Sequence, residues 1–237
     1  MTDKSIDKRE ESLRVFSQTA TIYDRIGPQI FSYFGQRLVD LADPHSGDRV
    51  LDVAAGRGAL LFPVAEKVGP TGHVTGIDFS PEMVRETAKD IESRKLSNAE
   101  MYHVDAERMN LPDASFDGVM CGFALWMFVE PARVLQEFCR VLRCGARVAL
   151  STWAADNPSQ AWLNGVLRPF VYAPSAKDLP AKFDTRFGTP LQLETALRQV
   201  GFGIRKSPLR RKISCTPMRN SIGRPSGRRV FGANSKR

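Results

Sequence analysis

Short apolar runs alternate with longer amphipathic stretches through most of the chain, which is the pattern of an α/β protein. The apolar runs are rich in β-branched residues and bounded by turn formers, and they predict strands over 49–55, 73–79, 99–104, 117–123 and 146–153. Between and after them, helices are predicted over 58–68, from Pro81 onward, over 131–142 and over 190–200. Right-handed crossovers join such elements into a doubly wound, mostly parallel sheet that binds ligands at the carboxyl ends of its strands.

Two segments outside this alternation are expected to cover the ligand site. Residues 10–43 predict two helices broken near Gly27 and Pro28, so we interpret residues 1–43 as an N-terminal helical lid over a domain spanning 44–205. Within that domain, residues 154–189 form an insertion that we expect to cover the substrate. Its aromatic residues are Trp162, Phe170, Tyr172, Phe183 and Phe187.

Composition is that of one ordinary globular domain, with 42% apolar and 25% charged residues among 237, and it argues against disorder or a disulfide-stapled miniprotein. The longest stretch without strongly polar side chains, 118–129, is too short to span a bilayer, and the first residues mix acids and bases unlike a signal peptide. We therefore expect a cytoplasmic protein without a membrane span. The four cysteines lack metal-ligand spacing, so no metal site or disulfide is expected.

The net charge of +8 comes from the end of the chain. Residues 203–237 hold 11 basic residues and no acid, while residues 1–202 carry 23 basic against 26 acidic residues. One interpretation of the tail, 206–237, is a disordered basic arm that binds RNA or anionic lipid. The other is a shifted reading frame, since permitted codons for 211–227 also encode an acidic, aromatic string. In that case the C-terminal strands are incomplete and the last strand has an open edge.

A glycine-bearing turn follows the first predicted strand, where backbone must approach a ligand closely. Gly56 and Gly58 belong to this turn, but a dinucleotide fingerprint would need glycine at position 61, which is Leu61. Asp78 lies 20 residues after Gly58 at the end of the second strand, where its carboxylate can accept hydrogen bonds from ribose hydroxyls. Ser80 already supplies the N-cap of the next helix, so the turn and Asp78 together predict an adenosine-containing ligand.

These residues resemble class I S-adenosylmethionine-dependent methyltransferases, in the branch of the ubiquinone and menaquinone C-methyltransferases. The resemblance covers about residues 15–205 and follows the family's order of motifs. It departs from the family at Ala54, where a glycine is usual, and in the turn within 140–147, where Pro-Gly-Gly is usual. The matching motifs are VLDVAAGRG at 50–58, GIDFSPEM at 76–83, DAE at 105–107 with LPDASFD at 111–117, RVLRCGAR at 140–147, and FGTP at 187–190 with GF at 201–202.

The resemblance implies S-adenosyl-L-methionine as cofactor, S-adenosyl-L-homocysteine as product, and a role for each matching residue. Residues of the turn, Ala54, Gly56 and Gly58, would lie under the methionine part. Asp52 would bind its ammonium, directly or through water. Toward the other end, Asp78 would hold the ribose, and Phe123 would lie near the sulfonium. The remaining implied contacts are a lid over the cofactor from Tyr23, packing against adenine by Phe79 and Met83, a hydrogen bond that Asp105 accepts from the adenine amine, and a backbone contact from Ala106.

The expected reaction is transfer of the methyl group to an O, N or C nucleophile of a small molecule. The cofactor is a strong electrophile, so the protein chiefly has to align the acceptor and exclude water. No catalytic base is predicted, because His45, His73 and His103 are all placed in structural or solvent-facing positions. Quinone-like, polyketide and amine acceptors all suit an aromatic pocket. A nucleic-acid methyltransferase steered by the tail and a truncated cofactor-binding protein without turnover are the alternatives.

Overall fold

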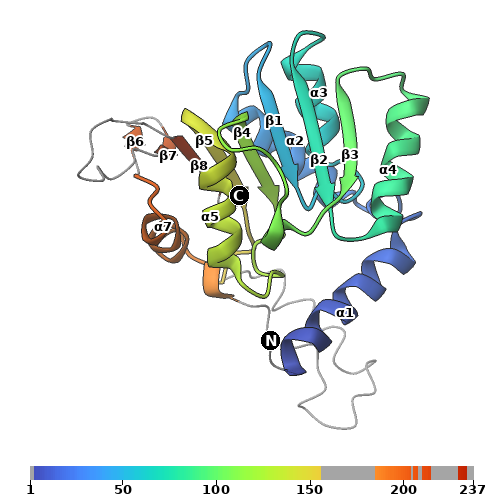
Figure 1. Cartoon of the computed structure of the whole chain (residues 1–237), viewed down its shortest axis with the longest axis horizontal. Coiled ribbons are helices and arrows are strands. Elements are labelled where there is room, and N and C mark those ends of the chain that lie inside the picture. The colour runs from blue at the N-terminus through green and yellow to red at the C-terminus, as the bar shows by residue number, and fades with distance from the viewer. Residues whose placement is uncertain (1–2, 156–184, 204, 208–209, 215–228, 234–237) are drawn as a thin grey trace.

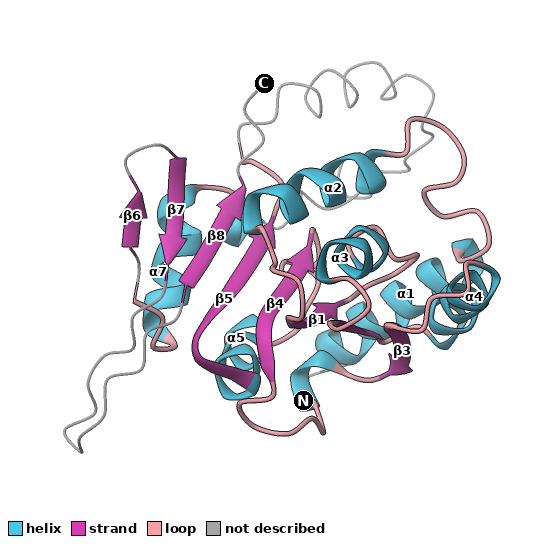
Figure 2. Cartoon of the chain, turned by 90° about the horizontal axis from the view of Figure 1, so that it is seen from above, coloured by secondary structure: helices cyan, strands magenta, loops and turns pink. Residues whose placement is uncertain are grey.

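A parallel sheet forms the centre of the computed structural model, which describes residues 3–155, 185–203, 205–207, 210–214 and 229–233. Six strands pair in the order β3-β2-β1-β4-β5-β8, and every pair is parallel (Figures 1 and 2). The doubly wound sheet predicted from the sequence is thereby confirmed. The strands are β1 (Arg49–Val53), β2 (His73–Asp78), β3 (Ala99–His103), β4 (Phe116–Gly122), β5 (Leu142–Ser151) and β8 (Arg229–Ala233).

Helices cover both faces of this sheet, and alternating strand residues point to one or the other (Figure 2). Val50 packs in the cluster that includes residues of α2 (Ile30–Ala42) and α3 (Leu61–Val68), whereas Leu51 and Val53 pack with α5 (Pro131–Val141) and α7 (Pro190–Gln199). The other described helices are α1 (Asp3–Thr19), α4 (Pro81–Ser93), η1 (Ala106–Arg108) and η2 (Thr185–Phe187). No helix in the described ranges is long and apolar enough to cross a membrane.

Capping residues set several helix starts where the sequence predicts them. The Ser80 hydroxyl accepts a hydrogen bond from the Met83 amide at 3.2 Å, and Pro81 occupies the first helical position of α4. At α7, Thr189 and Gln192 form a reciprocal capping box.

Two predicted boundaries are wrong for local reasons. Helix α3 begins at Leu61 instead of residue 58, because positive φ angles at Gly56 and Gly58 keep the turn out of helical geometry. Strand β5 begins at Leu142, directly after α5, four residues before the predicted start. Its first residue, Leu142, pairs with Phe116 before a register irregularity, which the apolar pattern does not reveal.

The N-terminal segment forms α1 and α2, separated by an irregular stretch that contains Gly27 and Pro28, as predicted. Helix α1 lies below α4 in the view of Figure 1, and α2 packs along β4 and β5. The aromatic insertion falls mostly outside the described residues, including Trp162, Phe170, Tyr172 and Phe183. Of its named aromatics, Phe187 is described, and it is buried in the core.

Strands occupy parts of the basic tail. The β6 (Arg205–Ser207) and β7 (Arg210–Ser214) strands pair antiparallel, and β8 pairs in parallel with β5 from Arg147 to Ser151. The edge of β5, expected from the sequence to be open, therefore has a partner. A run of arginine, serine and glycine gives no strand pattern, which is why the sequence did not indicate these elements.

Candidate functional site

The turn after β1 holds its backbone in an uncommon conformation. Ala54, Gly56 and Gly58 have φ angles of 56°, 51° and 80°. At Ala54 this costs energy, since a residue with a Cβ rarely adopts it. A Cβ added to Gly58 would lie 2.5 Å from the Phe62 ring, whereas one added to Gly56 would meet no atom within 4 Å. The turn thus presents bare backbone to open space at Gly56.

Asp78 fixes this turn to the end of β2. Its Oδ2 accepts a hydrogen bond from the Gly56 amide at 2.8 Å, and its Oδ1 accepts one from the Ser80 amide at 2.9 Å. Burial raises the pKa of Asp78, while these two amides and the nearby His103 act in the opposite direction. Each carboxylate oxygen keeps further acceptor capacity. The arrangement places a pre-oriented acceptor at the edge of a cavity.

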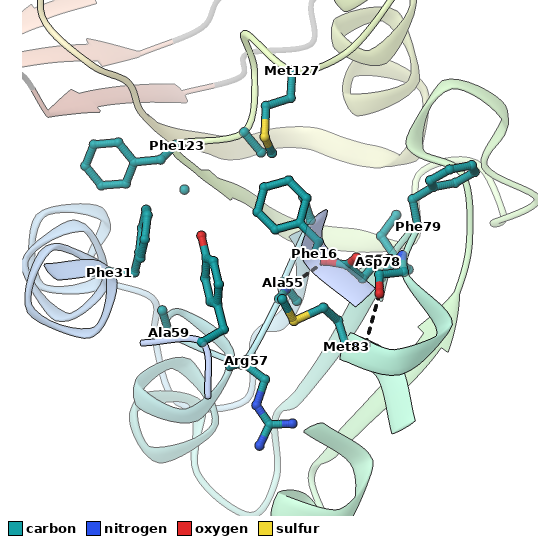
Figure 3. A pocket seen from close by; sticks show the side chains of 18 of the residues that line it. Phe16, Phe31, Ala55, Arg57, Ala59, Asp78, Phe79, Met83, Phe123 and Met127 are labelled. Carbon is teal, nitrogen blue, oxygen red and sulfur yellow. Dashed lines mark hydrogen bonds between the residues drawn. The ribbon is translucent and has the colours of Figure 1, made fainter. Parts of the chain in front are cut away.

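This cavity, of about 630 Å³, lies at the carboxyl ends of the strands (Figure 3). All of the predicted binding residues except Asp52 line it: Tyr23, Ala54, Gly56, Gly58, Asp78, Phe79, Met83, Asp105, Ala106 and Phe123.

Asp52 lies behind the turn, with none of its surface exposed, and it is not among the lining residues. Burial, reinforced by the charge of Asp78, raises the pKa of Asp52 from 3.8 to about 8, while the nearby backbone amide of Leu61 acts in the opposite direction. Asp52 is therefore a buried carboxyl group separated from the cavity surface.

At one end of the cavity, Asp105 caps η1 by accepting from the Glu107 amide at 2.9 Å through Oδ1. Its Oδ2 accepts from Arg9 of α1 at 2.5 Å. The Arg9 guanidinium also lies 5.0 Å from the centre of the Phe79 ring. Sequence reasoning missed Arg9, because a single arginine in a charged helix carries no pattern that distinguishes it.

The other end of the cavity is aromatic. The rings of Phe123 and Trp153 lie 4.5 Å apart, Phe31 approaches both at 5.9 and 6.2 Å, and Tyr23 stacks on Phe31 at 5.2 Å. Burial raises the pKa of Tyr23, so its hydroxyl stays protonated at neutral pH. Phe31 was predicted only as an apolar position of a helix, and Trp153 as the end of a strand. The topology brings them together, because α2 packs against β5.

A charged cluster joins the turn to α4 and to the loop between α1 and α2. Asp90 accepts hydrogen bonds from Arg57, at 2.6 Å, and from Arg25. The Thr87 hydroxyl donates to the Gly56 carbonyl at 2.7 Å, which adds a second link between α4 and the turn. These contacts attach both the turn after β1 and the loop that contains Arg25 to α4.

Histidines are absent from the described lining of the cavity. The His103 ring lies 2.9 Å from the Phe79 carbonyl, His73 pairs with Glu100 at 3.0 Å, and His45 lies 3.6 Å from Asp48. All three have the structural or peripheral positions that the sequence predicts.

Comparison with known proteins gives the same family as the motifs. The family described as "Methyltransferase domain" matches residues 44–183. The aklanonic acid methyltransferase DauC of Streptomyces sp. (strain C5) is 40% identical over 152 residues, covering 64% of this chain and 68% of the relative. Nocamycin O-methyltransferase of Saccharothrix syringae is 35% identical, covering 79% of this chain and 71% of the relative.

Demethylmenaquinone methyltransferase of Listeria innocua serovar 6a (strain ATCC BAA-680 / CLIP 11262) is 34% identical, covering 60% of this chain and 62% of that protein. Among solved structures, a SAM-dependent methyltransferase from Aquifex aeolicus superposes with a TM-score of 0.59 at 22% identity, covering 84% of this chain and 92% of that one, which shows the shared fold. The chain belongs to the methyltransferase domain family and is a class I S-adenosylmethionine-dependent methyltransferase.

Proposed function

We propose that the cavity binds S-adenosylmethionine with its ribose on Asp78, its adenine toward Asp105 and its methionine part along the turn after β1. The observation that carries this proposal is the carboxylate of Asp78, held by the Gly56 and Ser80 amides at 2.8 and 2.9 Å on the cavity wall. A carboxylate so placed can accept both hydroxyls of a ribose. The open space above Gly56 leaves room for the ligand to approach the backbone.

The aromatic end of the cavity supports a planar, conjugated acceptor. Phe31, Phe123 and Trp153 offer ring faces and edges with few polar atoms, which favours a flat apolar molecule over a chain of sugars or a charged peptide. The names of the relatives refer to aklanonic acid, nocamycin and demethylmenaquinone. The substrate class we propose is accordingly a quinone-like or polyketide-like small molecule, methylated on oxygen or carbon.

The chain's contribution to the reaction is alignment. The bound sulfonium supplies an electrophilic methyl group. Phe123 and Trp153 pack against the acceptor ring and fix its position in the cavity. Tyr23 and Phe31, from the N-terminal segment, complete the same aromatic wall. Such a wall positions the nucleophile along the sulfur–methyl axis and excludes water. Protonated Tyr23 serves as a hydrogen-bond donor and not as a base.

Calorimetric titration with S-adenosylhomocysteine tests this proposal, with NADH as a competing ligand. The Asp78→Ala variant is expected to lose at least about tenfold in affinity, because a charge-assisted pair of hydrogen bonds is removed. Asp40→Ala, an exposed carboxylate on α2, is the matched control and should bind like the unmodified chain. Equal affinity of all three proteins, or displacement by NADH, would overturn the proposed site. Transfer of a labelled methyl group to a panel of quinones, polyketides and amines then identifies the acceptor.

A further inference from the structure

Arg9 of α1 reaches the end of the cavity where we place the cofactor's adenine. Its guanidinium lies 2.5 Å from the Asp105 carboxylate, 3.9 Å from the Glu107 carboxylate and 5.0 Å from the Phe79 ring centre. Its side chain is only 21% exposed, and all four residues line the same cavity. A flat cation is thus held between an acceptor and an aromatic ring.

Adenine offers the same two recognition features. It is planar, so it can pack on the Phe79 ring, and its amino group can donate to the Asp105 carboxylate. Arg9 already lies on the Asp105 Oδ2 and beside the Phe79 ring, so an adenine that uses this oxygen and packs on this ring meets the guanidinium at both contacts. Two flat groups cannot occupy the same ring face together. Contacts of Arg9 and of adenine at this site are therefore alternatives.

The rest of α1 is also attached to the cofactor side of the domain. The hydroxyls of Ser17 and Ser80 lie 3.1 Å apart, and the Phe16 ring contacts Tyr23 edge-on at 5.7 Å. Ser80 caps α4 and donates its amide to Asp78, the proposed ribose acceptor. Helix α1 is consequently fastened at two points to residues next to the proposed cofactor contacts.

We infer that Arg9 is a latch that competes with the adenine of S-adenosylmethionine for Asp105 and Phe79, so that cofactor binding releases the N-terminal end of α1. The inference rests on the proposed function of the cavity. The apparent cofactor affinity is the intrinsic affinity multiplied by the fraction of molecules in which the latch is open. Because the side chains of Arg9 and Asp105 keep 21% and 24% of their surface exposed, added salt weakens this ion pair and shifts the balance toward cofactor binding.

The test compares Arg9→Gln with Arg9→Lys and with Arg14→Gln, an exposed arginine on the same helix. Dissociation constants for S-adenosylhomocysteine are measured by calorimetry at low and moderate salt. Arg9→Gln is expected to bind S-adenosylhomocysteine about three- to tenfold more tightly than the unmodified protein at low salt. Added salt should raise the affinity of the unmodified protein but not that of Arg9→Gln. Arg9→Lys keeps the charge but not the flat fork, and should fall between the two. Arg14→Gln should match the unmodified protein.

Hydrogen exchange of the α1 amides provides a second readout. If Arg9 had a purely structural role, ligand binding would not make this exchange faster. With the latch, exchange near Arg9 becomes faster when S-adenosylhomocysteine binds. Weaker binding by Arg9→Gln, or slower exchange on binding, would show that Arg9 contacts the bound cofactor and would overturn the latch. If the unmodified protein binds S-adenosylhomocysteine but Arg9→Gln is unchanged, the latch alone fails. If neither protein binds it, the proposed function itself fails.

Discussion

Replacing Asp52 with Asn should change how the stability of the protein depends on pH. Asp52 is fully buried, and the backbone amide of Leu61 only partly offsets the cost of burying its charge. Burial therefore raises its pKa from 3.8 to about 8, and the folded protein holds a proton there at neutral pH. In the unfolded chain the same carboxyl group is ionised above about pH 4.

The sign and size of the effect follow from linkage. Because the folded-state pKa is above the unfolded value, the stabilisation from this group is fully present below about pH 4 and is lost as the pH rises toward 8. A difference of about four pKa units corresponds to a ceiling of about 6 kcal/mol, of which about 4 kcal/mol falls between pH 5 and pH 8. An asparagine does not titrate, so the variant lacks this slope.

Urea unfolding at pH 5, 6, 7 and 8 measures the difference. The free energy of unfolding of Asp52→Asn relative to the unmodified protein should rise steadily with pH, while the exposed-site control Asp40→Asn stays level. Parallel pH profiles for Asp52→Asn and the unmodified protein would refute the reasoning.

Three further substitutions test the turn, the acceptor wall and the core. Gly58→Ala should destabilise the protein by about 2–4 kcal/mol in thermal melts, because its Cβ would lie 2.5 Å from the Phe62 ring. Gly27→Ala, with a similar φ but no atom within 4 Å, should cost only about 1 kcal/mol, and equal losses would contradict the clash. Phe31→Ala should raise the KM for the acceptor at least about fivefold with little effect on S-adenosylhomocysteine affinity, and steady-state kinetics showing the reverse would remove Phe31 from the wall. Leu197→Ala, fully buried on α7, should lower the unfolding free energy by about 3 kcal/mol, and an unchanged value would place α7 outside the core.

Local sequence patterns predicted the central sheet and most of the cavity. Asp78 and Ser80 follow a strand and precede a helix, so their positions depend on a few neighbouring residues and on the general rule for ligand sites in parallel sheets. The glycines at 56 and 58 likewise predict a turn in which a ligand can approach the backbone closely. The sequence could place these residues because each is fixed by its own strand or turn.

Contacts between distant segments were beyond that reasoning. Arg9 and Asp105 are 96 positions apart, and a surface arginine on a charged helix gives no sign of its partner. For Asp52, the sequence motif indicated the position of the residue but not its burial. That burial depends on how α3 and β2 pack around the end of β1. The pairing of β8 with β5 also depends on geometry that a basic, glycine-containing tail does not encode in its apolar pattern.

Asp90 links the N-terminal segment to the turn after β1. Its carboxylate accepts hydrogen bonds from Arg25, in the loop that follows α1, and from Arg57, in the turn after β1. Loss of Asp90 would remove the link between the loop and the turn, while the turn would keep its contacts with Asp78 and Thr87 through Gly56.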